Sequence, residues 1–231
     1  MVTPVMKSNG WRRFFPSLLV LVYGIVIMSL PANADSTGPI KIVAFGDSLT
    51  AGYLLPADKG FAPVLARVLK SRGHDVEIIN AGVSGDTTAA GLERLAWAVP
   101  PNADAVIVEL GANDALRGLS PQAARNNLDK ILATLKAQKS DILISGMRAP
   151  RSLGDNYVNA FDPIFADLAQ KYGAILHPFF LERIALKANL NLSDGIHPNE
   201  KGVEEIVADI LPKVEELIAR VKARRIIAKN G

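Results

Sequence analysis

The 231-residue sequence contains no cysteine. This excludes disulfide bonds, a thiol nucleophile and a lipid-modified cysteine behind a leader, so stability must come from burial of a core. Histidine is scarce too: the chain has three, and no second histidine lies at metal-ligand spacing from His197. No glycine-rich loop leads into a lysine, which is the pattern that cradles phosphates. The sequence therefore predicts no metal and implies no cofactor.

Acidic residues are also absent from the start of the chain, where the first is Asp35. Lys7, Arg12 and Arg13 make this segment positive, an apolar stretch follows over about 14–30, and Ala32-Asn33-Ala34 forms a small-x-small cleavage site. This order is typical of a secretory signal peptide. We predict that residues 1–34 are a leader, cleaved after Ala34.

An uncleaved membrane anchor is the alternative interpretation of this segment. Its most continuous apolar part, 18–30, is shorter than the roughly 20 residues that a spanning helix needs. We therefore expect an exported protein, periplasmic or secreted, with no stable membrane span after the leader is removed.

Cleavage would leave 197 residues, which suits a single domain over 35–231. The leader carries three of the 26 basic residues and none of the 23 acidic ones, so the mature chain has no formal net charge. This balance does not favour nucleic acid as a partner. The C-terminal part retains a cluster of basic residues: Arg220, Lys222, Arg224, Arg225 and Lys229. This cluster could contact anionic lipid or polysaccharide, but we predict that it is a solvated helix end. The oligomeric state is left open.

Short apolar runs alternate with amphipathic stretches throughout the mature chain. The runs predict strands over about 40–45, 75–80, 105–110, 141–145 and 174–176. The amphipathic stretches predict helices over 61–72, from about 86 to 97, from 120 onward, over 157–171, and from a cap at Asn199 to about 220 or beyond. Strands separated by helices predict a five-stranded parallel sheet covered on both faces, a three-layer α/β/α sandwich.

The tripeptide Gly46-Asp47-Ser48 stands where the first apolar run stops. A small residue at Gly46 lets the backbone turn, so Ser48 is presented at the C-terminal end of a strand, where open α/β sheets place their ligands. A hydroxyl there can act as a nucleophile if a base removes its proton.

Such a base is present near the other end of the chain. Asp194-Gly195-Ile196-His197 places a carboxylate three residues before an imidazole, so one turn can direct both toward a site. The unperturbed histidine pKa of about 6.5 leaves the ring largely neutral at pH 7. A carboxylate on the other ring nitrogen fixes its tautomer. Together these residues favour acyl transfer on a serine.

Each of these residues also has a structural interpretation. Ser48 or Asp47 can cap a helix, Asp194 can cap a turn around a buried His197, and Asn113 can brace a turn. Other polar residues we interpret as structural from the start: Thr50, His74, Asp86, Asp114 and His177.

Four short blocks carry most of this chemistry, in the order Gly46–Leu49, Ser84–Thr87, Gly111–Asp114 and Asp194–His197. Longer stretches around them read GDSLTAGY, NAGVSGDT, VELGAND, LRG and DGIHPN. In order and spacing the blocks resemble the SGNH hydrolase superfamily, also called GDSL lipases and esterases. The similarity covers about 40–215 and is greatest to the bacterial periplasmic group of thioesterases, lysophospholipases and arylesterases.

The resemblance implies a flavodoxin-like SGNH hydrolase fold and a role for each matching residue. Ser48 would be the nucleophile, His197 the general base and Asp194 the acid that orients it. The oxyanion hole would be formed by the backbone N–H groups of Ser48 and Gly85 and by the side-chain amide of Asn113.

The resemblance also implies a substrate class, namely aryl and short-to-medium acyl esters, with thioesters and lysophospholipids also hydrolysed. The partner would be a small acyl ester or thioester, or a lipid. We expect substrate contacts from Leu54 and Leu55 and, in a mobile loop over 147–154, from Met147, Arg148 and Pro150. A carbohydrate O-acetyl esterase of the same fold is the first alternative, and a non-catalytic ligand-binding module is the second.

Overall fold

The computed structural model describes residues 1–2 and 38–230, and every helix and strand belongs to the unit that spans 37–231. Except for Met1 and Val2, the predicted leader lies outside the described residues, and so does its predicted cleavage site. Among the residues that are described, no helix combines the length and the apolar character needed to cross a bilayer.

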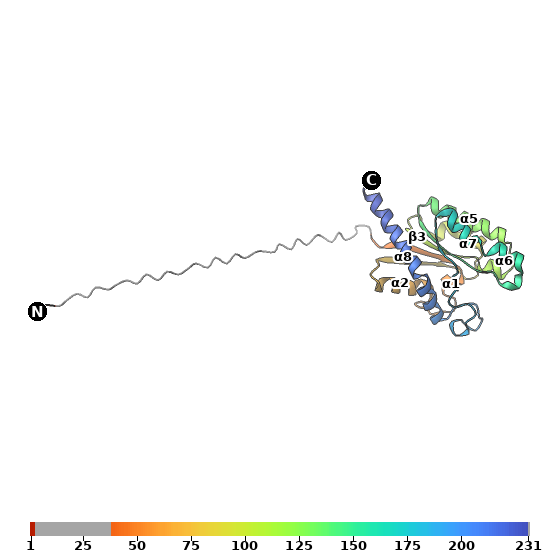
Figure 1. The fold of residues 1–231 in the computed structure, drawn as a ribbon, viewed down its shortest axis with the longest axis horizontal. Coiled ribbons are helices and arrows are strands. Elements are labelled where there is room, and N and C mark those ends of the chain that lie inside the picture. Colours follow the sequence, from red (N-terminus) through yellow and green to blue (C-terminus); the bar gives the residue numbers. More distant parts are fainter. Residues whose placement is uncertain (3–37, 231) are drawn as a thin grey trace. The chain divides into compact units, whose positions relative to one another are not determined.

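One parallel sheet of five strands organises the chain (Figure 1). The strands are β1 (Ile40–Gly46), β2 (Val76–Gly82), β3 (Ala105–Glu109), β4 (Asp141–Ser145) and β5 (Ile175–His177). They lie in the order β2-β1-β3-β4-β5, the flavodoxin-like order, and every neighbouring pair is parallel. The predicted sheet is confirmed.

Helices cover both faces of this sheet, with α5 and α7 on one side and α2 and α8 on the other (Figure 1). The helices are α1 (Ser48–Ala51), α2 (Phe61–Ser71), α3 (Thr88–Ala98), α4 (Ala112–Leu116), α5 (Pro121–Ala137), α6 (Asp155–Phe161), α7 (Ile164–Tyr172) and α8 (Glu200–Asn230). Two 3₁₀ turns, η1 (Arg151–Leu153) and η2 (Ala188–Leu190), complete the fold. The predicted three-layer α/β/α architecture is confirmed.

The core forms where the apolar pattern of the sequence places it. All five residues of β3 are buried, as expected for a central strand covered on both faces. The helical stripe of α5 is buried along its length: Ala124, Leu128, Ile131, Leu132 and Leu135. Ser120 caps this helix and Pro121 occupies its first turn, as the sequence predicts.

The helix predicted over 157–171 is wrong in one respect, because the structure has two helices there. Pro163 has no N–H to donate to the preceding turn, so α6 ends at Phe161 and α7 begins at Ile164. The residue at the break, Asp162, accepts a hydrogen bond from the Ala149 N–H at 2.9 Å and pairs with Arg151 at 2.8 Å. The break thereby anchors the loop that follows β4.

The basic C-terminal cluster is also not merely a solvated helix end. Arg224 donates to the Asp141 carboxylate at 3.0 Å, and Arg225 donates to the Asp104 carboxylate at 2.7 Å. Arg225 further reaches the carbonyl oxygens of Gly38 and Pro39. These contacts fix the last turns of α8 to residues beside the start of the sheet.

The strand register brings the C-terminal ends of all five strands to one edge. Gly46 lies opposite Gly82 on one side and Glu109 on the other, and Ser145 lies between Glu109 and His177. The strand order reverses between β1 and β3, which is the position where open α/β sheets bind ligands. The blocks that follow β1, β2 and β3 therefore converge there.

Candidate active site

Ser48 is the first residue of α1, immediately beyond the end of β1. Asp47, rather than Ser48, is the N-cap: its carboxylate accepts a hydrogen bond from the Leu49 N–H at 3.0 Å. The Ser48 hydroxyl is thus not used in capping. Helix α1 packs closely against the end of β2 because Gly82 has no side chain, and a Cβ there would lie 2.3 Å from the Ala51 nitrogen.

The residues Asp194 to His197 form a tight turn ahead of α8. Gly195 adopts a φ of +71°, a conformation that favours glycine. One carboxylate oxygen of Asp194, Oδ1, accepts from the backbone N–H groups of Ile196 and His197 at 2.9 and 3.0 Å. The turn is closed by a hydrogen bond from the Leu192 N–H to the His197 carbonyl at 2.8 Å.

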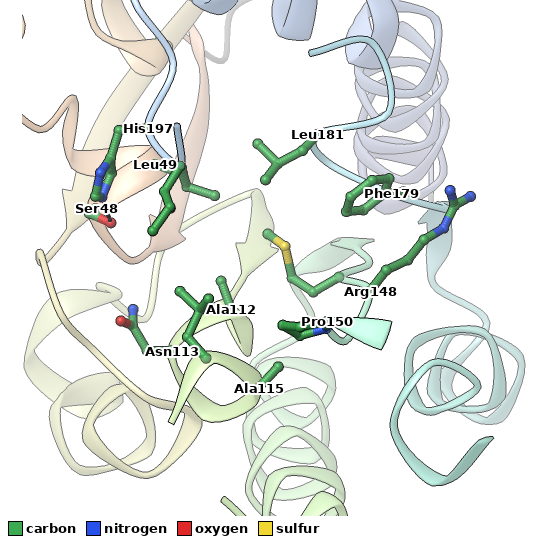
Figure 2. Close-up of a pocket in the computed structure, with 13 residues that line it drawn as sticks. Ser48, Leu49, Ala112, Asn113, Ala115, Arg148, Pro150, Phe179, Leu181 and His197 are labelled. Atoms are coloured by element: carbon green, nitrogen blue, oxygen red, sulfur yellow. Dashed lines mark hydrogen bonds between the residues drawn. The ribbon is translucent and has the colours of Figure 1, made fainter. Parts of the chain in front are cut away.

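This turn brings the imidazole to the serine. His197 Nδ1 lies 2.7 Å from Asp194 Oδ2, and His197 Nε2 lies 2.9 Å from Ser48 Oγ. Figure 2 shows the His197 ring directly over the Ser48 side chain. Because an ionised carboxylate only accepts hydrogen bonds, Nδ1 carries the proton and Nε2 is left to accept one from the serine.

The charge of Asp194 is stabilised by this geometry. Hydrogen bonds from the His197 and Ile196 backbone, followed by the one from the imidazole, lower the pKa of Asp194 from 3.8 to about 2. The carboxylate is therefore ionised at neutral pH. It can hold the ring in one tautomer and balance a positive imidazolium.

Tyr53 provides a contact that the sequence interpretation missed. Its ring centroid lies 4.5 Å from that of His197, with the two planes tilted by 39°. Its position inside the GDSLTAGY stretch was the available signal, because α1 turns back at Gly52 directly before it.

Asn113 lies in α4, just beyond β3, and lines the same cavity as Ser48. Its Nδ2 donates to the Asp86 carbonyl at 2.9 Å and to Asp47 Oδ2 at 3.1 Å. An amide nitrogen carries two hydrogens, so both have protein acceptors here. Donation to a third oxygen requires one of these hydrogen bonds to be shared or exchanged.

Gly85 lies in the turn between β2 and α3, with a φ of +88°. The helix expected from about residue 86 begins slightly later, because α3 starts at Thr88. Thr87 is the N-cap, and its hydroxyl accepts a hydrogen bond from the Ala90 N–H. The helix N-terminus is therefore three residues beyond the glycine.

Two acids lie beneath the serine. Glu109 is fully buried, and its Oε2 accepts from the Thr50 hydroxyl at 2.7 Å and from the Asp47 N–H at 3.4 Å. Its Oε1 has no hydrogen-bond partner among the described residues. Burial raises the pKa of Glu109 well above its usual value and that of Asp47 to about 6. A glutamate ending an apolar strand was the sequence signal for this buried group, and the prediction did not use it.

The residues interpreted as structural do have structural partners. Asp114 accepts from the Thr88 N–H and hydroxyl at 2.8 and 2.6 Å, so it caps α3 from a neighbouring segment. Asp86 pairs with the buried Arg94. His74 contacts Glu215 at 3.2 Å.

A second serine–histidine–aspartate cluster lies at the ends of β4 and β5. His177 Nδ1 is 2.8 Å from Ser145 Oγ, and its Nε2 is 3.1 Å from Asp209 Oδ2. Ser145 is completely buried, so its hydroxyl cannot meet a substrate. Burial lowers the pKa of His177. This cluster joins β4 and β5 to α8, whereas Ser48 lines a cavity together with its histidine.

A cavity of about 160 Å³ opens beside Ser48 and His197 (Figure 2). Of the substrate contacts expected from the sequence, Met147, Arg148 and Pro150 line it, whereas Leu54 and Leu55 do not. Met147 is buried, so the loop after β4 begins packed into the protein. The lining residues that the sequence did not indicate are all apolar: Leu49, Ala112, Ala115, Leu116, Phe179, Leu181 and Ile196.

Over the stretch from 38 to 230, no three histidine, aspartate or glutamate side chains gather closely enough to hold a metal ion. The groups that meet at Ser48 are a hydroxyl, an imidazole and a carboxylate.

Comparison with known proteins identifies relatives of this chain. Residues 44–205 match the GDSL-like Lipase/Acylhydrolase family. An arylesterase from Vibrio mimicus is 37% identical over 185 residues, which cover 78% of this chain and 92% of the arylesterase. A protein of Escherichia coli K12 named thioesterase 1/protease 1/lysophospholipase L1 is 35% identical over 207 residues, covering 89% of this chain and 93% of that protein.

A solved structure extends the similarity to three dimensions. The crystal structure of AlinE4, described as an SGNH-hydrolase family esterase, is 49% identical and superposes with a TM-score of 0.66. The superposition covers 77% of this chain and 96% of AlinE4.

Proposed function

Since the chain belongs to the GDSL-like lipase/acylhydrolase family and is a serine esterase of the SGNH type, we propose that Ser48, His197 and Asp194 are its catalytic triad. The observation that carries this proposal is the pair of contacts made by one ring, 2.9 Å to the Ser48 hydroxyl and 2.7 Å to the Asp194 carboxylate. The hydroxyl has a base within reach, and the base has an orienting acid.

The reaction proceeds in two half-reactions. In the first, Ser48 Oγ attacks the ester carbonyl while His197 Nε2 takes its proton, and a tetrahedral oxyanion forms. The C–O bond to the alcohol, or the C–S bond to a thiol, then breaks, and the leaving group takes the proton from the imidazolium. In the second, water loses a proton to His197, attacks the acyl-enzyme and releases the carboxylic acid. Ser48 recovers its proton.

The oxyanion is stabilised by the backbone N–H groups of Ser48 and Gly85 and by the Asn113 amide. Support for Asn113 comes from its place in the cavity lining beside Ser48. Its contact with Asp47 at 3.1 Å, the longer of its two hydrogen bonds, is the one we expect to be shared with the oxyanion. Fixed donors of this kind typically contribute a factor of about 10²–10³ in turnover each.

The acyl group occupies the cavity beside Ser48. Its volume of about 160 Å³ is close to that of an engineered apolar cavity of about 150 Å³ that binds benzene. Aryl groups and short-to-medium acyl chains fit such a space. The names of the relatives, an arylesterase and a thioesterase/lysophospholipase, support aryl esters, thioesters and lysophospholipids as substrates.

Covalent labelling tests the triad. A fluorophosphonate probe should label the protein at Ser48, and labelling should disappear in Ser48→Ala. Thr50→Ala is a matched control, because it removes a nearby hydroxyl that bonds to Glu109 and not to His197. Labelling that persists in Ser48→Ala, or none in the wild-type protein, would show that Ser48 is not the nucleophile.

Substrate preference is tested with p-nitrophenyl esters of increasing acyl length, thioesters and acetylated sugars. We expect the highest kcat/KM with short-to-medium acyl esters. Activity restricted to acetylated sugars would instead support the carbohydrate O-acetyl esterase, and binding without turnover would support a ligand-binding module.

We further propose that the enzyme is exported and that its leader is cleaved after Ala34. The support is the basic start, apolar stretch and small-x-small site of the sequence. N-terminal sequencing of protein purified from the expressing cells should find Asp35 first. A retained Met1 would favour the membrane anchor.

A further inference from the structure

The cavity beside Ser48 has a larger neighbour. A second cavity, of about 470 Å³, is separated from the first by two side chains, Arg148 and Phe179, which line both. The rest of its lining comes from β5, the loop after it and α8: His177, Pro178, Glu182, Asp209, Pro212 and Lys213. The end of the first cavity is therefore a wall of side chains.

This wall is held by two weak contacts. The Arg148 guanidinium lies 4.6 Å from the centre of the Phe179 ring and donates to Glu182 at 2.8 Å. Figure 2 shows Arg148 running past Phe179, with its guanidinium directed away from Ser48. The Arg148 and Glu182 side chains are 45% and 51% exposed, and ion pairs this open contribute little to stability. Breaking this ion pair therefore costs little free energy.

The second cavity suits an uncharged chain. Its charged side chains already have protein partners, because Glu182 holds Arg148, Asp209 holds His177 and Lys213 contacts Glu216. Pro178, Phe179 and Pro212 supply apolar surface. A free anion or cation would compete with these pairs for its partner, whereas methylene groups displace only the exposed Arg148–Glu182 pair.

We propose that the Arg148–Glu182 pair over Phe179 is a partition that limits acyl length, and that the second cavity receives the distal methylenes of long acyl chains when Arg148 moves aside. This rests on the proposed function, in which the acyl group of the ester enters the first cavity. The partition makes short chains the favoured substrates and leaves long chains as slower ones.

The test is the ratio of kcat/KM for p-nitrophenyl dodecanoate to that for the butanoate. Arg148→Ala should raise this ratio at least about tenfold, since even one methylene accommodated in an apolar pocket is worth about that factor. The matched control is Arg151→Ala, which removes a cation from the same loop that pairs with Asp162 and lines neither cavity. Its ratio should equal that of the wild-type protein.

A second substitution addresses the cavity itself. Lys213→Trp, introduced into the Arg148→Ala protein, places a large side chain in the second cavity from α8 and should reverse the gain. An unchanged ratio in Arg148→Ala, or a gain that survives Lys213→Trp, would overturn the proposal. Raising the salt concentration from about 0.01 to about 1 M screens the ion pair. It should raise the ratio in the wild-type protein more than in Arg148→Ala, and an equal rise in both would contradict the partition.

Failure of this inference is distinguishable from failure of the proposed function. A protein that hydrolyses butanoate through Ser48 but shows no change of ratio refutes only the partition. A protein that hydrolyses none of the esters and takes up no fluorophosphonate refutes the esterase proposal itself.

Discussion

Replacement of Asp194 by asparagine separates two functions of this side chain. Its Oδ1 accepts two backbone hydrogen bonds that shape the turn, whereas its Oδ2 faces His197 Nδ1 at 2.7 Å. In Asp194→Asn the amide oxygen can still hold the turn, but the NH₂ group now points at Nδ1. The ring must then carry its proton on Nε2, where it cannot accept the proton of Ser48.

The expected loss follows from this change of tautomer. The corresponding substitution in a serine protease lowers kcat by about 10⁴, or about 5.4 kcal/mol in the barrier. Stability should change much less. The fall in the Asp194 pKa from 3.8 to about 2 corresponds to about 2.4 kcal/mol at most. With 36% of the side chain exposed, solvent screening reduces this to about 1 kcal/mol.

The pH dependence has a definite sign. A carboxylate whose pKa is lowered in the folded protein stabilises it above the unfolded pKa, so this contribution is present at pH 7 and is lost as the pH falls from about 4 toward about 2. Urea unfolding of wild type and Asp194→Asn should therefore differ at pH 7 and converge in acid. Asp58→Asn, on an exposed turn, should match the wild-type protein throughout.

Kinetics with p-nitrophenyl butanoate show whether Asp194 acts in catalysis or only shapes the turn. Asp194→Ala should lose as much kcat as Asp194→Asn and more stability, because it also frees the two backbone N–H groups. If folded Asp194→Asn retains more than about a tenth of wild-type kcat, where a loss of about 10⁴ is expected, Asp194 serves only the turn and the proposed triad is wrong.

Substitutions at three further positions probe the surroundings of the triad. Asn113→Ala should lower kcat by about 10²–10³ with little change in KM. A higher KM with an unchanged kcat would argue against Asn113 as an oxyanion donor. Tyr53→Ala should reduce kcat by up to about tenfold, which is the effect of losing one aromatic contact. Tyr53→Phe keeps the ring that lies 4.5 Å from His197 and should retain activity. Equal losses of kcat in the two variants would assign the effect to the hydroxyl. Gly82→Ala places a Cβ 2.3 Å from the Ala51 nitrogen, so it should cost about 1–3 kcal/mol in thermal unfolding and impair activity by shifting α1, and a wild-type Tm would contradict this.

The fold was predictable because its elements depend on local patterns. Every apolar run that predicted a strand is a strand, since a strand buried on both faces must be apolar along its length. The helix stripe of α5 was equally clear. The prediction failed at α6 and α7, where helical periodicity continues on both sides of Pro163 although the helix does not. It also missed the short helices α1 and α4, which are too brief to show a period.

The candidate site was predictable to the extent that chemistry is carried by short blocks of sequence. Ser48, Asn113, Asp194 and His197 could be named because each stands in such a block. Leu54 was named for its closeness to Ser48 in the chain, yet the residue is 74% exposed and lies outside the cavity lining. Distance along the sequence does not indicate direction in space, and α1 turns the chain back at Gly52 before Leu54 is reached.

By itself the sequence determined the order of strands and helices and the types of reactive group, because hydrophobic periodicity and short motifs are local properties. Only the tertiary structure decided which side chains come into contact and which are buried. It joined Ser48 to a ring 149 positions away, buried Glu109 beneath it, left Ser145 inaccessible beside a second histidine, and set Arg148 between two cavities. These outcomes depend on strand register and helix packing, in which residues from distant segments share one small volume, and no local pattern encodes them.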